Sequence, residues 1–291
     1  MKKKLLVTIL ILVTLITTGC FKRDEMENIN IITTIYPLEY ITNYLYGKNS
    51  TVRSIYPDAV DVNIYKFNDK QITDFSKNDL FIYKSVDNDK DIAIKLLKKN
   101  KNILLIDATY GMVTELGTGG SDLWLNPSHL LMISSNIKNG LKEYINNKYL
   151  KEEIEDNYQK LKIEISVLDA NIILAINNAT NKTILVNDDS LLFLEKYGLK
   201  VISLDARNNN VSDKLINDIK EMIDNKEIKY LYSLNNKKLN NYSTSIIEDT
   251  KIENIIINDL TSITDEERDN KENYITLITK NIELLKKQLY D

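Results

Sequence analysis

The sequence predicts an α/β protein in which two parallel-sheet lobes are joined by one long rigid helix. Short β-branched runs alternate with amphipathic stretches on both sides of residues 149–180, a pattern typical of parallel sheets with right-handed crossovers. Residues 149–180 themselves contain no Gly or Pro and repeat apolar side chains at helical spacing. These two observations together predict the architecture.

The predicted linking helix runs from about Tyr149 to Ala179. At a rise of about 1.5 Å per residue it would extend roughly 40 Å, further than a small domain is wide, so it should connect two units. A coiled-coil dimerisation arm is the alternative, but about four heptads are near the minimum for one and the flanking charges are irregular. The residues of the apolar face are Ile154, Tyr158, Leu161, Ile165, Leu168, Ile172 and Ala175.

Composition indicates a folded protein and argues against nucleic acid as a partner. Of the 291 residues, 43% are hydrophobic, enough to bury the core of one large or two ordinary domains. The formal charge is −4; without the three lysines of the first nineteen residues the chain has 35 basic and 42 acidic side chains, or −7. Binding to phosphates needs a basic surface, which this balance does not provide.

Residues 1–19 resemble the signal peptide of a bacterial lipoprotein. Lys2, Lys3 and Lys4 precede an apolar run that is too short to span a bilayer, and the only cysteine of the chain, Cys20, follows two small residues and Gly19. Thr17 departs from the pattern, which usually has Leu there. The alternatives are an ordinary secretory peptide with a chance cysteine, or a membrane span. We expect lipidated Cys20 to anchor the protein to the extracellular face of the cell membrane, with residues 20–28 as a charged tether.

The N-terminal lobe is predicted to cover residues 29–148. Ile, Thr and other apolar residues mark its strands, expected at residues 29–36, 51–56, 80–83 and 103–106. Helices are expected at residues 38–46, 69–77 and around 92–97, and a further one should begin at Ser128, which can cap it, and reach Tyr144. Residues 110–127 carry four glycines and predict a loop, without the pattern of a phosphate-binding turn.

The C-terminal lobe is predicted to cover residues 181–291 and repeats the alternation. Strands are expected at residues 183–186, 201–204, 230–234 and 255–257. Helices are expected at residues 191–197, 211–223, 242–248 and 271–289. In open α/β sheets, ligands bind beyond the carboxyl ends of the strands, so the cleft between the lobes is the expected ligand site.

Several segments resemble the solute-binding proteins of zinc and manganese ABC importers, also called the adhesin-lipoprotein family. The resemblance implies a monomeric, membrane-anchored protein for metal ion transport that delivers its ligand to an ABC permease. It also implies the fold described above. The segments that carry it are residues 35–38 (Ile-Tyr-Pro-Leu), 79–83, 123–127 (Leu-Trp-Leu-Asn-Pro), 196–199 and 273–277, followed by Asn281.

The resemblance also implies positions for the ligands. Members of the family typically hold the metal with three histidines and a carboxylate or a further histidine, but this chain has one histidine, His129, expected to be an exposed residue at a helix start. By local spacing, the three family histidines correspond to Asn63, Asp122 and Asn187. The fourth ligand corresponds to Ser233 or lies near Asn258 and Asp259, and Asp188 adds charge.

These residues offer carboxylate and amide oxygens in place of imidazole. Zinc sites are built mostly from thiolate and imidazole, so a zinc site of the usual kind is not intact. Oxygen ligands suit harder cations such as manganese, calcium or magnesium, with Asn63, Asp122, Asn187 and Asp259 as the candidate metal ligands. The alternative for each residue is a hydrogen-bonding role at a strand end or in a loop.

Two functions follow. The first is the membrane-anchored solute-binding component of a metal-type ABC importer. The second is a degenerate, metal-independent surface receptor or scaffold that binds another partner. An enzyme is not expected, because the chain has no Gly-x-Ser-x-Gly turn and no thiol after Cys20. The adjacent Asp188 and Asp189 should point to opposite faces after a strand, so at most one enters the cleft.

Overall fold

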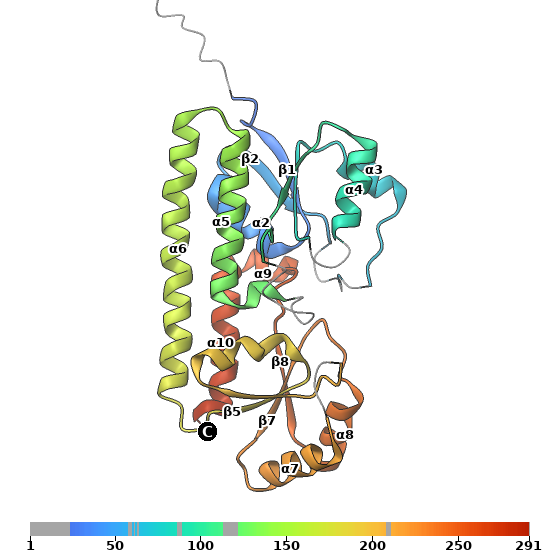
Figure 1. Cartoon of the computed structure of the whole chain (residues 1–291), viewed down its shortest axis with the longest axis vertical. Coiled ribbons are helices and arrows are strands. Elements are labelled where there is room, and N and C mark those ends of the chain that lie inside the picture. Colours follow the sequence, from blue (N-terminus) through green and yellow to red (C-terminus); the bar gives the residue numbers. More distant parts are fainter. Residues whose placement is uncertain are drawn as a thin grey trace, which may run out of the picture.

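Two four-stranded parallel sheets form the two lobes, which lie one above the other beside a long helix (Figure 1). The computed structural model describes residues 24–57, 60, 62, 64–85, 89–112, 122–207 and 211–290. The strand order is β2-β1-β3-β4 in the N-terminal lobe and β6-β5-β7-β8 in the C-terminal lobe. The two lobes therefore repeat one topology, and the predicted fold class is confirmed.

The N-terminal lobe pairs β1 with β2 and β3, and β3 with β4. Its strands are β1 (Ile29–Thr33), β2 (Ser50–Ser54), β3 (Leu80–Tyr83) and β4 (Leu104–Asp107). Its helices are α2 (Tyr36–Tyr46), α3 (Asp69–Phe75), α4 (Asp89–Lys99), the 3-10 helix η2 (Leu123–Leu125) and α5 (Pro127–Tyr144).

Two predicted boundaries in this lobe are wrong for the same physical reason. The first strand ends at Thr33 and α2 begins at Tyr36, because Pro37 occupies the first helical turn, where its missing N–H costs nothing. Likewise α5 begins at Pro127, so its cap is Asn126 instead of Ser128. The Asn126 side chain accepts a hydrogen bond from the Ser128 N–H at 3.1 Å.

The C-terminal lobe contains one helix that was not predicted, the short α9 (Asp265–Asp269). Thr264 and Glu267 cap it reciprocally, each side chain accepting from the other residue's backbone N–H. The strands are β5 (Thr183–Val186), β6 (Lys200–Ser203), β7 (Tyr230–Leu234) and β8 (Glu253–Ile257). The remaining helices are the 3-10 helix η3 (Asp189–Tyr197), α7 (Asp213–Asp224), α8 (Asn241–Thr250) and α10 (Tyr274–Tyr290).

The linking helix α6 (Lys148–Asn177) runs beside both lobes for 30 residues, as predicted (Figure 1). All seven residues of its predicted apolar face are buried. That face packs against α2 and α5 of the N-terminal lobe and against α10 and η3 of the C-terminal lobe. The predicted apolar face is therefore used within the chain, to join the two lobes, and not as the seam of a coiled coil.

The described part of the predicted tether, residues 24–28, packs against the turn between α5 and α6. Asp24 accepts hydrogen bonds from the N–H groups of Asn146 (2.8 Å) and Asn147 (2.6 Å), and Met26 is buried. The predicted signal peptide and Cys20 lie outside the described residues. Within the described ranges, no helix is long and apolar enough to cross a membrane.

The chain crosses between the lobes again after β8, and this crossing fixes Trp124 at the lobe junction. The indole N–H of Trp124 donates to the carbonyl of Asp259 at 2.6 Å, and the Tyr274 hydroxyl donates to the Trp124 carbonyl. Arg268 of α9 forms an ion pair with Glu39 of α2 at 3.0 Å. The two bonds of Trp124 hold residues 122–126 of the N-terminal lobe against the C-terminal lobe, and the ion pair holds α9 against α2.

Candidate functional site

The ammonium group of Lys237 lies among acidic side chains at the junction of the lobes. Its Nζ is 2.6 Å from Asp122 Oδ2, which belongs to the N-terminal lobe, and 3.2 Å from Asp188 Oδ1, which belongs to the C-terminal lobe. It also contacts Ser190 Oγ at 2.5 Å. The two carboxylate side chains are 6% and 9% exposed and that of Lys237 is 21% exposed, so the interaction is largely shielded from water.

Ser190 joins the two carboxylates independently of the lysine. Its hydroxyl donates to Asp122 Oδ2 at 2.8 Å and also contacts Asp188 Oδ1, while its N–H donates to Asp188 Oδ1 at 2.9 Å. Asp188 is the cap of η3, so its carboxylate orientation is set by the helix start. The cluster is therefore a fixed set of oxygen atoms drawn from both lobes.

The sheet topology explains why these residues meet. Asp188 and Ser190 follow β5, and Lys237 follows β7, and these two strands are parallel neighbours. Their carboxyl ends point toward the N-terminal lobe, where Asp122 precedes η2. As predicted, the adjacent carboxylates diverge: Asp188 faces Lys237, whereas Asp189 accepts a hydrogen bond from Ser203 Oγ at 2.6 Å.

The electrostatics of the cluster favour the charged lysine. Burial lowers the pKa of Lys237, but the attraction of Asp122 and Asp188 outweighs burial and leaves the pKa above its ordinary value. The nearby Asp259 behaves differently. Burial, together with the negative charge of Asp122, raises the pKa of Asp259 to about 6, against the hydrogen bonds from Thr261 and the positive charge of Lys237. The junction therefore holds one strongly bound cation and an excess of acidic groups.

A comparison with protein families identifies this architecture. Residues 31–288, most of the chain, match the family model described as zinc-uptake complex component A, periplasmic. The chain belongs to this family. Its members are metal-binding solute-binding components of zinc and manganese ABC importers and not enzymes, which confirms the predicted class.

Individual relatives agree with this assignment. The zinc-binding lipoprotein AdcA of Streptococcus pneumoniae is 22% identical over 98% of the chain, which spans only 60% of that relative's length. The Zn(II)-bound ZnuA-like domain of the same AdcA superposes with a TM-score of 0.71 at 22% identity, covering 91% of this chain and 100% of that domain. The metal-dependent lipoprotein YcdH of Bacillus subtilis gives 0.73 at 19% identity, with the same coverage. At these identities the structural likeness establishes the fold.

Of the ligand positions implied by the family resemblance, Asp122 and Asp188 come together around Lys237. Asp259 is 2% exposed and couples electrostatically to Asp122, while its carboxylate accepts from the Thr261 hydroxyl at 2.6 Å and the Thr261 N–H at 3.1 Å. Asn63 lies outside the described residues.

The remaining predicted positions are engaged in structural hydrogen bonds. The Asn187 side chain accepts from the Asn240 N–H at 2.9 Å. Ser233 Oγ donates to Asn254 Oδ1 at 3.1 Å, on the neighbouring strand. The Asn258 side chain accepts from the Leu260 N–H at 2.8 Å and donates to Glu267. These three side chains therefore match the alternative of a hydrogen-bonding role.

His129 is half-buried in the first turn of α5 and not exposed as predicted, because its ring packs back onto the helix cap. Its Nδ1 lies 3.3 Å from the Asn126 side-chain nitrogen. Over the described residues, no three His, Cys, Asp or Glu side chains are grouped so that they could hold a metal ion. The cluster around Lys237 instead pairs two acidic side chains with a lysine.

Sequence reasoning missed Lys237 and Ser190. Lys237 stands three residues after the predicted end of β7, beside Lys238, and such a pair suggests a solvated loop. The rule that ligands bind beyond the carboxyl ends of parallel strands was the available signal, since both residues follow strands that end at the lobe junction.

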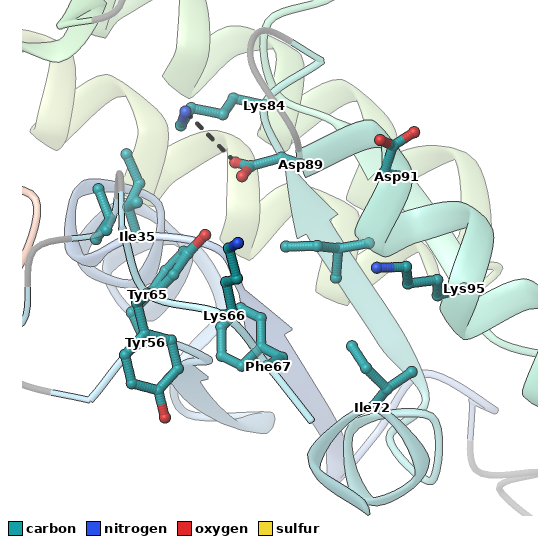
Figure 2. A pocket seen from close by; sticks show the side chains of 12 residues that line it. Ile35, Tyr56, Tyr65, Lys66, Phe67, Ile72, Lys84, Asp89, Asp91 and Lys95 are labelled. Atoms are coloured by element: carbon teal, nitrogen blue, oxygen red, sulfur yellow. Dashed lines mark ion pairs between the residues drawn. The ribbon is translucent and has the colours of Figure 1, made fainter. Parts of the chain in front are cut away.

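A polar cavity lies inside the N-terminal lobe (Figure 2). It has a volume of about 450 Å³, and three aromatic rings, those of Tyr56, Tyr65 and Phe67, form one wall with centroids 4.8–5.9 Å apart. At its opposite side Lys84 and Asp89 form an ion pair at 3.6 Å, with side chains 8% and 4% exposed. This cavity belongs to a single lobe and its buried pair is neutral overall.

Proposed function

We propose that the protein is a lipid-anchored solute-binding component on the extracellular face of the cell membrane, and that it delivers a divalent cation to an ABC permease. Family membership supports the transport role, and the relative AdcA is named as a zinc-binding lipoprotein. The signal sequence that ends at Cys20 supports the anchor.

The observation that carries the proposal is the convergence of Asp122 and Asp188, from opposite lobes, on one cation. Their oxygens and the Ser190 hydroxyl form a site at the position where open α/β proteins bind ligands. Carboxylate and hydroxyl oxygens suit hard cations such as manganese, calcium or magnesium better than zinc. We therefore propose an oxygen-ligated divalent cation, and not zinc held by histidines, as the solute.

One observation favours the second candidate, a receptor or scaffold that works without metal. The ammonium of Lys237 already bonds to both carboxylates and to Ser190, so the cluster is held together by the chain's own side chains. In that case the cleft region would bind another partner.

A cation panel tests the proposal. The mature chain, residues 21–291, would be stripped with chelator and studied by native mass spectrometry and thermal melting with manganese, zinc, iron, calcium and magnesium. A cation that binds only the folded state stabilises it by about 2.7 kcal/mol at a hundredfold excess over Kd. We expect a one-to-one adduct and a raised melting temperature for a hard cation, lost in Asp122→Ala.

Asp189→Ala is the matched control, because Asp189 carries the same charge one residue from Asp188 but bonds to Ser203. It should keep the cation response. An unchanged melting temperature across the panel would contradict the metal proposal and favour the metal-independent receptor. Uptake is tested separately: cells that lack the protein should accumulate less of the cation under limitation, and normal accumulation would contradict the transport role.

A further inference from the structure

We propose that Lys237 is a built-in cation that occupies the solute position between the lobes and must leave before a divalent cation can bind. This inference rests on the proposed function and adds how binding of the solute at the same site is regulated. The Lys237 side chain is the specificity-determining group, because it holds the same oxygen atoms that a divalent solute would need.

The geometry makes the two cations mutually exclusive. Asp122 Oδ2 lies 2.6 Å from Lys237 Nζ and 2.8 Å from Ser190 Oγ, so this oxygen is already at hydrogen-bond distance from two groups. A hard divalent cation sits about 2.0–2.6 Å from each ligand oxygen. An ion placed between Asp122 and Asp188 would therefore take the space of the ammonium group.

Counting charges shows why a divalent ion can displace the lysine. Asp122 and Asp188 contribute −2 and Lys237 contributes +1, so the three side chains that bond to one another have a net charge of −1, and the nearby Asp259 adds to the negative charge. A divalent ion in place of the ammonium neutralises one more negative charge than the lysine does. A monovalent ion only reproduces the charge of the lysine and gains nothing.

The position of Lys237 allows it to move out. It lies in the loop between β7 and α8, its side chain is 21% exposed, and its neighbour Lys238 is exposed. A lysine carries its charge on a flexible four-carbon stem, so the ammonium can reach water by rotation of side-chain bonds. The exposed edge of the cluster is where the lysine leaves and the solute enters.

The expected consequence is that a higher concentration of the solute is needed to fill the site. When only a fraction of molecules is competent to bind, the apparent Kd rises in inverse proportion to that fraction. Charge-assisted hydrogen bonds of the strength expected here hold the closed form at about 10- to 100-fold excess over the open form. Removing the ammonium should therefore tighten divalent cation binding by about the same factor.

Calorimetric titration of manganese and calcium into chelator-stripped chain 21–291 tests this. Lys237→Met keeps an unbranched side chain as long as the lysine stem and removes the ammonium group, and Lys238→Met is the matched control on the next residue. We expect Lys237→Met to bind about 10- to 100-fold more tightly than the wild type, and Lys238→Met to bind like the wild type. Without cation, Lys237→Met should melt at a lower temperature than the wild type, and cation should restore it.

The wild-type chain provides a measurement that does not depend on a variant folding. Amine-reactive labelling followed by mass spectrometry should modify Lys238 quickly and Lys237 slowly, and saturating manganese or calcium should speed the labelling of Lys237 alone. Equal labelling of the two lysines without cation would overturn the inference.

The outcomes separate this inference from the proposed function. Cation binding of equal affinity in the wild type and Lys237→Met would overturn the role of Lys237 and leave the proposed function intact. Binding by Lys237→Met with only weak binding by the wild type supports both. A Lys237→Met chain that is destabilised and not restored by any cation overturns the inference, since the lysine would then be structural.

Discussion

A lysine contacts aspartate both at the junction between the lobes and in the cavity of the N-terminal lobe. The two clusters differ in net charge and in whether their residues come from one lobe or from both. Lys84 and Asp89 form a neutral pair within one lobe, both less than 10% exposed (Figure 2). Lys237 faces two carboxylates, one from each lobe, and leaves a net negative charge. A neutral buried pair has no net charge for another ion to neutralise, whereas the net negative charge of the interlobe cluster is what the proposed divalent cation would neutralise. The contrast suggests that the first is structural and the second functional.

The largest effect should come from breaking the neutral pair. Lys84→Met removes the ammonium group from a buried ion pair with Asp89, and removal of one partner from a buried pair costs about 3–5 kcal/mol. Urea unfolding would measure the loss. Lys95→Met, at the exposed rim of the same cavity, should change the free energy of unfolding by less than about 0.5 kcal/mol. If Lys84→Met changes the free energy of unfolding as little as the control does, the pair of Lys84 and Asp89 is not a structural one.

The second effect concerns pH. Burial raises the pKa of Asp259 from 3.8 to about 6, so the folded state binds this proton more tightly than the unfolded chain. Stability from this group is therefore fully present below about pH 4 and is lost as the pH rises through about 6, by up to about 3 kcal/mol. Urea unfolding across this range should show the loss, and Asp259→Asn should lack this contribution. If the pH dependence of stability of Asp259→Asn instead matches that of the wild type and of the exposed control Asp269→Asn, burying the charged carboxylate of Asp259 at the junction has no energetic cost.

The smallest effect should come from Ser190. Ser190→Ala removes the hydroxyl that joins the carboxylates of Asp122 and Asp188, but Lys237 still bridges them, so the cost should be about 1 kcal/mol. The matched control is Ser128→Ala, whose exposed hydroxyl accepts from Lys196 at 2.7 Å and should matter less. Thermal or urea unfolding checks both. A loss as large as that of Lys84→Met would show that the junction, too, is a structural cluster.

Local periodicity was enough to predict most of the fold. Strands β3, β5 and β7 have the bounds that the apolar runs predicted, and α6 is within two residues at each end. Strands β2, β4, β6 and β8 differ from the predicted bounds by one or two residues at one end or both, and the predicted loop 110–127 contains η2. Two other misses occur where capping competes with the hydrophobic pattern. Asn126 caps α5 because Pro127 suits the first helical turn, and α9 is a polar helix whose only signal was the Thr264–Glu267 capping box.

The site was harder to predict because its decisive contact is not local. Lys237 bonds to Asp122, which lies 115 positions away in the chain, and the sequence around neither residue contains a motif that indicates the other. Resemblance to the family selected Asp122, and its charge selected Asp188, but spacing also selected Asn187 and Ser233, whose side chains bond elsewhere. A spacing rule locates a backbone position, and the partner of the side chain depends on the tertiary fold.

The shared helix has a consequence for how the molecule unfolds. The larger of two apolar clusters runs along α6 and includes residues of both lobes, such as Ile31 of β1 and Val186 of β5, while the smaller one lies within the C-terminal lobe. Unfolding either lobe alone would strip one half of the helix of its packing, and a helix that loses its apolar contacts is marginal in water. We therefore expect the lobes to melt in a single cooperative transition, and the amide protons at the centre of α6 to exchange with solvent only when the whole chain opens.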